Sequence, residues 1–371
     1  YTLKLRKLFK LLPEGKIEIL QKHFCYHLPN SPKPFKKTLE KFLGIEPREQ
    51  ETEFDPLNSS SCIEYANLAA SLQKVTEEMV FHMVDFAAKK TNSKNLCIAG
   101  GVGLNSVLNG KLIYEKGFNL FVQPASGDSG ASFGAALACY FEKSKKPRRE
   151  IFTNPFLGKA YHENEYRNLF VNCGYEIKKR CVNEKELVNL TARLIAEGNV
   201  IGWFQGRSEW GPRSLGNRSI LANPTMENIQ EIVNSKIKFR ELFRPFAPAV
   251  VEEHASDFMD LKDNLDDTDP LRFMLAVTKV NTDKIPSTTH ADGSGRFQVV
   301  SKRINPLFHK LITRFGQITG CYAVLNTSFN LKGEPMVESP RDALRTFNQS
   351  EINFLVVGNY VISNSAKVDL K

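Results

Sequence analysis

The sequence of 371 residues has no apolar run approaching the ~18 residues of a membrane-spanning helix, so we expect no membrane span. Its seven cysteines are scattered and include no CxxC pair, which argues against a zinc site and indicates reduced thiols. The chain also lacks internal repeats and low-complexity tracts. These absences favour a globular, cytoplasmic protein.

The beginning of the chain lacks both an initiator methionine and a signal-peptide cleavage site. Its first residues, YTLKLRKLFKLL, are basic and apolar, but a signal peptide would need that site. We therefore expect the chain to begin inside a longer protein.

The composition is that of a globular protein, with 42% hydrophobic and 25% charged residues. The length exceeds one ordinary hydrophobic core and predicts two domains. A charged break, KSKKPRR, occupies residues 143–149, so we predict domains over residues 1–148 and 149–371. The net charge of +9 permits nucleic acid as a partner, but no basic run is long enough to require it.

Two Gly-rich turns follow a helical segment in the first predicted domain. Apolar residues recur at three- and four-residue steps over residues 62–90, which predicts a helix. A strand over residues 95–98 ends in AGGVGLN, and a strand over residues 120–123 leads into PASGDSGASFGAAL. Such turns let backbone N–H groups approach a ligand. Asp128 either faces a metal or phosphate group or caps the helix expected over residues 130–141, and both roles are compatible.

The second predicted domain alternates strands and helices, which indicates an α/β fold. We expect helices over residues 185–197, 226–236 and 306–319 and from Ser339 onward. We expect strands over residues 200–204, 273–280 and 322–325, a hairpin over residues 354–362, and an acidic loop over residues 260–269.

The stretch from Gly202 to Pro248 concentrates positive charge on a backbone rich in glycine. Guanidinium groups match phosphate and carboxylate oxygens bidentately, and few carboxylates lie nearby, so this pattern favours an anion site. A solvated basic face is the alternative, but interleaved aromatic rings and a buried strand at the start argue against it. The cations are Arg207, Arg213, Arg218, Lys236, Lys238, Arg240 and Arg244.

The pair His23 and His27 has the HxxxH spacing that brings two rings to one face of a helix for a metal. Here the surrounding residues favour a strand running into a Pro turn. On a strand the two rings would lie ~13 Å apart. We therefore expect both histidines to be structural.

Six motifs occur in order from Ala99 onward. They are AGGVGLN, QPASGDSGASFGAAL, GRSEWGPRSLGNRSILANP, FRPFAP, HADGSGRFQVV and LNTSFNLKGEPMVESPRDAL. Together they resemble the O-carbamoyltransferases of the NodU and cephalosporin carbamoyltransferase family. The resemblance implies the C-terminal part of an ASKHA-type (actin/Hsp70-like) module followed by a YrdC-like α/β domain with a twisted sheet. It also implies an upstream HxxxH on a helix and a second aspartate, neither of which this sequence contains, so we expect a C-terminal portion of the full enzyme.

The resemblance implies roles for residues within these motifs. Asp128 would bind a metal, and His290 would bind or transfer the carbamoyl group. The turn that meets adenosine would contain Gly100, Gly101 and Asn105. Carbamoyl phosphate and the nucleotide would be held by Arg213, Lys238, Arg244, Arg296 and Asn326, with Arg207 and Arg218 in the same motif.

In such enzymes the second module makes carbamoyl-adenylate from carbamoyl phosphate and ATP, and the first passes the carbamoyl group to a hydroxyl. The implied cofactors are ATP and a divalent metal, iron or magnesium. The implied partners are carbamoyl phosphate, ATP and a hydroxyl-bearing small-molecule or sugar acceptor, with no specific nucleic acid and no membrane. A homodimer is one possible assembly. No Ser-His-Asp arrangement or reactive cysteine is evident, so we expect no covalent enzyme intermediate.

Two other functions remain open. The first alternative is an RNA-directed module for threonylcarbamoyl-type tRNA modification, but the motifs WGPRSLGNRS and FRPFAP favour the small-molecule branch. The second is a non-catalytic nucleotide-binding protein, against which the intact arginines and Asp128 argue.

Overall fold

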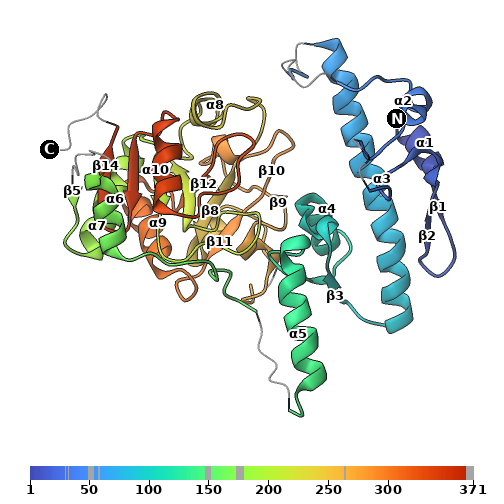
Figure 1. Cartoon of the computed structure of the whole chain (residues 1–371), viewed down its shortest axis with the longest axis horizontal. Coiled ribbons are helices and arrows are strands. Elements are labelled where there is room, and N and C mark those ends of the chain that lie inside the picture. The colour runs from blue at the N-terminus through green and yellow to red at the C-terminus, as the bar shows by residue number, and fades with distance from the viewer. Residues whose placement is uncertain are drawn as a thin grey trace. The chain divides into compact units, whose positions relative to one another are not determined.

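The computed structural model describes residues 1–29, 31, 33–48, 54–56, 59–146, 152–172, 179–262 and 265–364. The chain divides into two compact units, residues 1–94 and residues 95–371, and each is described by itself (Figure 1). Within the described residues, no helix is long and apolar enough to cross a membrane.

The first unit is built around one long helix, α3 (Ser60–Thr91), which confirms the helix predicted over residues 62–90. The short helix α1 (Thr2–Leu5) packs against it and is followed by an antiparallel hairpin. The small core of this unit contains Leu5, Leu8, Leu43 and Val75. The remaining elements are β1 (Phe9–Leu11), β2 (Ile17–Ile19) and α2 (Lys37–Leu43).

The HxxxH segment does not form the expected strand. Gln21–His23 is a short 3₁₀ helix. His23 is buried with its ring centroid 5.1 Å from that of Phe42, and its Nδ1 lies 3.2 Å from Oγ1 of Thr38. This packing against α2 overrides the strand pattern, as tertiary contacts often do. His27 is exposed in the turn that follows.

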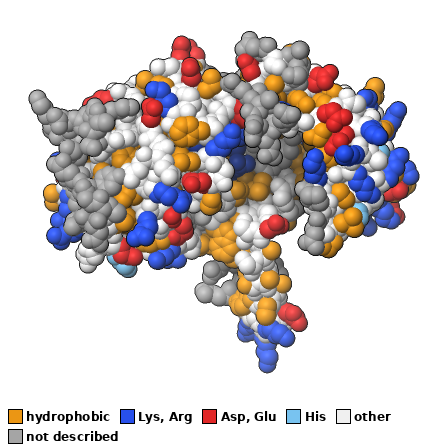
Figure 2. Space-filling model, turned by 45° about the horizontal axis from the view of Figure 1, so that its top comes forward, with side chains coloured by type: hydrophobic (Ala, Val, Ile, Leu, Met, Phe, Trp, Pro, Cys, Tyr) orange, Lys and Arg blue, Asp and Glu red, His pale blue; other side chains and the backbone are white. Residues whose placement is uncertain are grey.

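The second unit begins with two parallel strands, β3 (Asn95–Ile98) and β4 (Asn119–Val122), which confirm the two strands predicted there. Helix α4 (Ser106–Tyr114) connects them, and α5 (Ala131–Lys143) follows. Apolar side chains lie along the exposed surface of α5 (Figure 2).

Eight strands form the mixed sheet that dominates the second unit, in the order β11-β8-β12-β7-β6-β13-β14-β5. The pairs β11–β8 and β6–β13 are parallel, and the other neighbours are antiparallel. The strands are β5 (Lys179–Arg180), β6 (Ile201–Phe204), β7 (Arg218–Ala222), β8 (Ala247–Val251), β11 (Gln298–Val300), β12 (Ala323–Ser328), β13 (Phe354–Val357) and β14 (Tyr360–Ser363).

Helices cover this sheet, and buried side chains of the helices and strands together form the hydrophobic core. Helices α7 and α9 pack against each other and against the strands, and α6, α8 and α10 enclose a buried cluster that includes Phe204, Ile220 and Phe347 (Figure 1). Consecutive strand residues point to opposite faces, so Trp203 points away from that cluster. The helices are α6 (Glu163–Asn172), α7 (Glu184–Ala196), α8 (Ile229–Val233), α9 (Pro306–Thr319) and α10 (Pro340–Asn348).

One prediction of secondary structure in this unit is wrong, and another is right in type but shifted in its bounds. The strand expected over residues 273–280 is mostly loop. Its first residue ends a 3₁₀ helix, Pro270–Phe273, and its last residues are extended, as β9 (Thr278–Lys279), which pairs with β10 (Ser294–Gly295), and a bridge from Val280 to Met259. Oδ1 of Asp269 accepts the Leu271 N–H at 2.8 Å and starts the turn, and the hydrogen bond from Arg272 to Glu252 at 2.6 Å holds it. The helix expected from residue 226 begins at Ile229 and ends as a π-helix, Asn234–Lys238.

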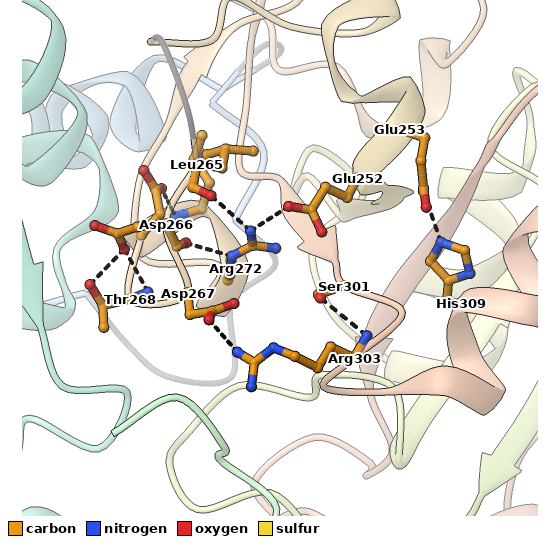
Figure 3. Close-up of polar contacts among 12 residues, drawn as sticks. Glu252, Glu253, Leu265, Asp266, Asp267, Thr268, Arg272, Ser301, Arg303 and His309 are labelled. Carbon is orange, nitrogen blue, oxygen red and sulfur yellow. Dashed lines mark hydrogen bonds and ion pairs between the residues drawn. The ribbon is translucent and has the colours of Figure 1, made fainter. Parts of the chain in front are cut away.

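The acidic loop expected over residues 260–269 is held by one buried arginine (Figure 3). Arg272 donates to the backbone oxygens of Leu265 and Asp266, at 3.0 and 2.6 Å, and to Oε1 of Glu252 at 2.6 Å. Arg303 forms an ion pair with Asp267 at the surface. The described part of the loop is therefore a structural element, and its described acids have partners of their own.

Candidate functional site

The cation-rich stretch places its charges on loops at the ends of the central strands. One loop joins β6 to β7, a second leads from the π-helix to β8, and a third precedes β11. The charges of Arg213 and Arg240 lower the pKa of Arg296, which shows that the three loops bring these guanidinium groups together. We refer to Arg213, Arg240 and Arg296 as the arginine cluster.

Two members of the cluster have no partner for their charge. Arg213 and Arg296 are partly buried, and the Nε of each is buried without a hydrogen bond. Burial lowers the pKa of Arg213, and burial with the two neighbouring charges lowers that of Arg296 to about 9. Within the described residues no carboxylate forms an ion pair with either. A site that holds cations apart from water and from acids is suited to an anionic ligand.

The third member, Arg240, is tied to the fold by Asn234. Its Nε donates to Oδ1 of Asn234 at 2.7 Å, and its guanidinium lies 4.6 Å from the ring centroid of Phe246. The amide of Asn234 donates to the backbone oxygens of Leu242 and Arg244, both at 3.0 Å. Burial and the charge of Arg244 lower the pKa of Arg240 to about 10. One buried asparagine thus shapes the whole second loop.

Lys238 is buried at the end of the π-helix among uncharged acceptors. Its Nζ donates to the backbone oxygen and Oγ of Ser328 and to the backbone oxygen and Oδ1 of Asn330, the last at 2.7 Å. Burial, with a contribution from the charge of Arg240, lowers its pKa well below the ordinary lysine value. The amine is therefore fixed at the end of β12, and among the described residues no acid pairs with it.

Glu209 organises the loop that carries Arg213. Its Oε1 accepts the backbone N–H groups of Leu215, Asn217 and Arg218, at 2.7, 2.9 and 3.2 Å. The same loop turns at Gly211, where φ is 128° and a Cβ atom would lie 2.7 Å from the backbone oxygen of Pro124. A side chain at that position would displace the loop.

Arg218 lies in the same motif but is bound by the protein itself. It is fully buried on β7, its guanidinium stacks 3.6 Å from the centroid of Phe204, and its Nη1 donates to the backbone oxygens of Gln205 and Asn217 at 2.6 and 3.0 Å. Its Nη2 donates to Gly206 at 3.2 Å. The structure separates it from the arginine cluster and gives it a scaffolding role.

Asn326 is buried on β12 and supports the loop of Arg213. Its Nδ2 donates to Oε1 of Gln298 at 2.8 Å and to the backbone oxygen of Ser214 at 3.3 Å, and its Oδ1 accepts from the Ser214 hydroxyl at 3.3 Å. Gln298 in turn donates to the backbone oxygen of Leu215 at 2.8 Å. The amide therefore positions the residue next to Arg213.

The other predicted arginines of this stretch are exposed. Arg244 forms an ion pair with Glu241 at 2.8 Å, with half of its side-chain surface accessible. Arg207 donates from Nη2 to the backbone oxygen of Leu157 at 3.3 Å. Arg244 is near enough to lower the pKa of Arg240, so it lies at the rim of the cluster.

His290 lines a pocket of about 310 Å³ between α4 and the β9–β10 pair, near enough to Arg296 of the arginine cluster for that charge to act on its imidazole. Its Nδ1 lies 3.0 Å from Oγ of Ser294. Burial and the charge of Arg296 lower the pKa of His290, and the charge of Asp292 raises it. The wall of this pocket is closely packed, because a Cβ at Gly110 would lie 2.2 Å from the Val277 backbone oxygen.

The predicted adenosine turn lies in the first part of this unit. Gly100 has φ of 96° and its N–H donates to the backbone oxygen of Ser126 at 2.8 Å, while a Cβ at Gly100 or Gly101 would meet no atom within 4 Å. Asn105 caps α4, because its Oδ1 accepts the Leu108 N–H at 3.1 Å. The open glycines leave room for a ligand beside the turn.

Asp128 begins a short 3₁₀ helix, Asp128–Gly130, ahead of α5, and its side chain is exposed. Within the part of the chain that the structure describes, no group of three or more His, Cys, Asp or Glu residues could hold a metal ion. Stable metal sites usually need three or four protein ligands. The described residues around Asp128 therefore do not fit a metal site.

Several residues of the site could not be identified from sequence motifs. Arg240 is recognisable in the sequence only as one cation of the basic stretch, and it is not among the predicted site residues. Glu209, Asn234 and Gln298 gave no signal, since an isolated acid or amide in a loop has many common roles. Each acts through hydrogen bonds to backbone groups distant in sequence.

Two family models match the chain. The carbamoyltransferase N-terminus model matches residues 32–137, and the carbamoyltransferase C-terminus model matches residues 192–364.

Three similar proteins cover most of the chain. Nodulation protein NolO of Bradyrhizobium diazoefficiens is 38% identical over 302 residues, 81% of this chain and 55% of that protein. Nodulation protein NolNO of Sinorhizobium fredii is 40% identical over 305 residues, 81% of this chain and 44% of that protein. An uncharacterized protein of Synechocystis is 36% identical over 323 residues, 81% of this chain and 52% of that protein. The chain spans about half the length of the curated relatives it matches.

A crystal structure of full-length HypF in the phosphate- and nucleotide-bound form aligns with 50% of this chain and 22% of that one. The TM-score is 0.33 and the sequence identity 13%. This likeness is too distant to support an argument about the fold or the site.

Proposed function

The chain belongs to the carbamoyltransferase family of enzymes, and we propose that it serves ATP-dependent O-carbamoyl transfer. The second unit binds carbamoyl phosphate and ATP and makes carbamoyl-adenylate. The carbamoyl group then passes to a hydroxyl of a small-molecule or sugar acceptor. No covalent bond to the protein is needed, so the rate enhancement comes from positioning and electrostatic stabilisation.

The observation that carries this proposal is the unneutralised arginine cluster. Carbamoyl phosphate and ATP are both polyanions, which repel each other unless cations lie between them. Arg213 and Arg296 are partly buried with no ion-pair partner among the described residues, and Arg240 lies beside them. A phosphate group placed among the three would satisfy the orphaned Nε–H groups of Arg213 and Arg296 and relieve the mutual repulsion of all three charges.

Lys238 and Asn326 have different tasks in this proposal. The buried amine of Lys238 supplies a fixed hydrogen-bond donor at the end of β12, where it would orient a phosphoryl group. Asn326 acts through Ser214, because its amide is already engaged by Ser214 and Gln298. It keeps the Arg213 loop in place.

We further propose that the eight-stranded sheet and its helices form a YrdC-like domain, and that the segment containing β3, β4 and α5 is part of an ASKHA-type module. A boundary near residue 148 stays a prediction, and it falls between the two segments that match family models. In this arrangement the open turn at Gly100 and Gly101 would meet adenosine.

The test is binding and turnover of carbamoyl phosphate by the chain and by Arg213→Ala. Each lost charge-assisted contact costs about 1.5–3 kcal/mol, so calorimetry should show roughly 10- to 150-fold weaker binding. Phosphate and pyrophosphate release in the presence of ATP should fall with it.

The matched control is Arg180→Ala, which removes the same charge from β5, the strand at the far edge of the sheet. This variant should bind carbamoyl phosphate as tightly as the unaltered chain. Equal affinity in Arg213→Ala and the control would exclude the arginine cluster as the anion site.

A further inference from the structure

The loop containing His290 holds a hydrogen-bonded relay of three side chains. Oγ of Ser294 lies 2.6 Å from Oδ1 of Asp292 and 3.0 Å from Nδ1 of His290. The backbone fixes this arrangement, since the His290 N–H donates to the Ser294 oxygen at 2.7 Å and the Ser294 N–H donates to Oδ1 of Asp292 at 3.0 Å. The three groups therefore form one rigid turn.

The direction of each hydrogen bond follows from the chemistry of the three groups. An ionised carboxylate only accepts, so the Ser294 hydroxyl must donate its proton to Asp292. The pKa of Asp292 is lowered, first by that hydrogen bond, which keeps the carboxylate charged. The Ser294 oxygen can then only accept from the imidazole, so Nδ1 of His290 carries the proton.

This assignment leaves a lone pair on the other ring nitrogen. Neutral imidazole has one N–H, so Nε2 of His290 is unprotonated. Within the described residues Nε2 forms no hydrogen bond, and His290 lines the pocket beside α4. Burial and the nearby charge of Arg296 lower the pKa of His290, which favours the neutral ring at neutral pH.

We propose that Ser294 and Asp292 are positioning residues that hold Nε2 of His290 as the proton acceptor for hydrolysis of carbamoyl phosphate. The inference rests on the proposed function. It adds a general base to a site otherwise made of cations, and it names the two residues that fix its tautomer.

The stoichiometry of the proposed reaction requires such a base. A water oxygen bonds to the carbonyl carbon, the bond from that carbon to the phosphate oxygen breaks, and phosphate leaves with the electron pair. The products are carbamate, hydrogen phosphate and one proton, which Nε2 accepts. The carbamate oxygen then attacks the α-phosphorus of ATP and expels pyrophosphate, which forms carbamoyl-adenylate.

The first test reads the tautomer without any turnover. In the ¹⁵N-histidine-labelled chain, two-bond ¹H–¹⁵N spectra distinguish a protonated from an unprotonated ring nitrogen. The signal absent from His290→Gln identifies His290, which should show a protonated Nδ1. His309 serves as an internal reference of opposite sense, because its Nε2 faces Oε2 of Glu253 at 2.8 Å.

Variants of the relay should shift that tautomer in a predictable order. Ser294→Ala removes the acceptor for the Nδ1 proton, so the preference for this tautomer should be lost. Ser294→Thr retains a hydroxyl and should keep it. Asp292→Asn can donate to the serine oxygen and should reverse the relay, which moves the proton to Nε2.

The second test measures phosphate release from carbamoyl phosphate. Ser294→Ala should lower kcat about 10- to 100-fold, within the range of general-base catalysis, with little change in KM, and Ser294→Thr should recover most of the rate. In the unaltered chain kcat should fall at low pH with a midpoint below the ordinary pKa of histidine, because the neutral ring is the active form and the pKa of His290 is lowered. Besides Asp292 and Arg296, the charged or titratable groups lining the pocket are Lys111, Tyr114, Glu115, Asp260 and Lys279.

The outcomes distinguish a failure of this inference from a failure of the proposed function on which it rests. An unaltered chain that releases no phosphate refutes the proposed function and the role of the base with it. Phosphate release by the unaltered chain and by Ser294→Ala at equal kcat and equal pH dependence overturns the inference alone. A protonated Nε2 in the unaltered chain overturns it too, whatever the rates.

Discussion

Replacing Arg296 by methionine should stabilise the ligand-free protein and weaken its binding of anions at the same time. Methionine keeps a long, flexible apolar side chain but removes the charge and the donors. The structure gives Arg296 no ion-pair partner among the described residues, and its Nε is buried without a hydrogen bond. Arg296 therefore lowers the free energy of unfolding of the ligand-free protein, and a bound anion would offset that loss.

The magnitude follows from the surroundings of the guanidinium. A buried donor without a partner costs about 1–3 kcal/mol, and the charges of Arg213 and Arg240 add repulsion. We expect the free energy of unfolding to rise by about 1–3 kcal/mol in Arg296→Met. For a unit of this size each kcal/mol raises Tm by roughly 2–4 °C.

Tryptophan fluorescence is a suited assay because the only two tryptophans of the sequence, Trp203 and Trp210, belong to the second unit. Thermal and urea unfolding followed by this signal report on the unit that contains the cluster. Calorimetry with inorganic pyrophosphate should show roughly 10- to 150-fold weaker binding to Arg296→Met, for one lost charge-assisted contact.

The matched comparison is Arg272→Met, because Arg272 is a buried arginine whose Nε and Nη2 donate to protein groups, while its Nη1 is buried without a hydrogen bond. It donates to Glu252 at 2.6 Å and to two backbone oxygens (Figure 3). Its loss leaves these acceptors unpaired and should destabilise the unit by about 3 kcal/mol or more. If Arg296→Met destabilises the protein as Arg272→Met does, the reasoning about an unneutralised ligand site is refuted.

Three further predictions concern other residues. Folding lowers the pKa of Lys238, so between its folded pKa and the ordinary lysine value the unfolded chain binds more protons and the free energy of unfolding rises with pH. Lys238→Met should flatten this rise when Tm is measured from pH 7 to 10. Equal slopes of Tm against pH in the variant and the unaltered chain would contradict the lowered pKa. Replacing His23 and His27 together by glutamine should leave metal content by elemental analysis unchanged, because His23 packs against Phe42; loss of a bound metal would show a site there. Transfer RNA should bind weakly, with affinity falling steeply as salt rises, and retention of one particular tRNA at physiological ionic strength would favour the RNA-directed alternative.

Much of the fold follows from local sequence signals. The helix Pro306–Thr319 has the expected bounds, and Ser339 caps α10 in a complete capping box with Asp342. Strands β3, β4, β6 and β13 were expected because each is a short apolar run bounded by turn residues. In these places local propensity and tertiary packing agree.

The failures have a common physical cause. The run over residues 273–280 has the composition of a strand, but the cap at Asp269 and the contacts of Arg272 hold its first part as a 3₁₀ helix. His23 likewise belongs to a segment whose sequence favours a strand, but its ring packs against Phe42 of α2 instead. Both outcomes depend on partners distant in sequence, which a local pattern cannot reveal.

The basic stretch illustrates the same limit for function. Arg213 and Arg218 stand five positions apart in one Gly-rich motif, and the sequence alone treats them alike. In the structure, backbone oxygens of Gln205, Gly206 and Asn217 surround the guanidinium of Arg218, whereas none is offered to Arg213. Glu209 fixes the loop between the two arginines, since its carboxylate accepts the N–H groups of residues 215, 217 and 218.

An arginine whose terminal nitrogens donate to backbone oxygens, as those of Arg218 do, contributes rigidity. An arginine that has no such acceptors is available to bind an anionic ligand. The loop needs both kinds, because a cation binds an anion tightly only where it is held in place before the ligand arrives. Arg218 and Glu209 hold the loop in place, which positions Arg213 to bind an anion. A motif dense in arginine therefore indicates that an anion binds, while the distribution of backbone acceptors decides which arginine binds it.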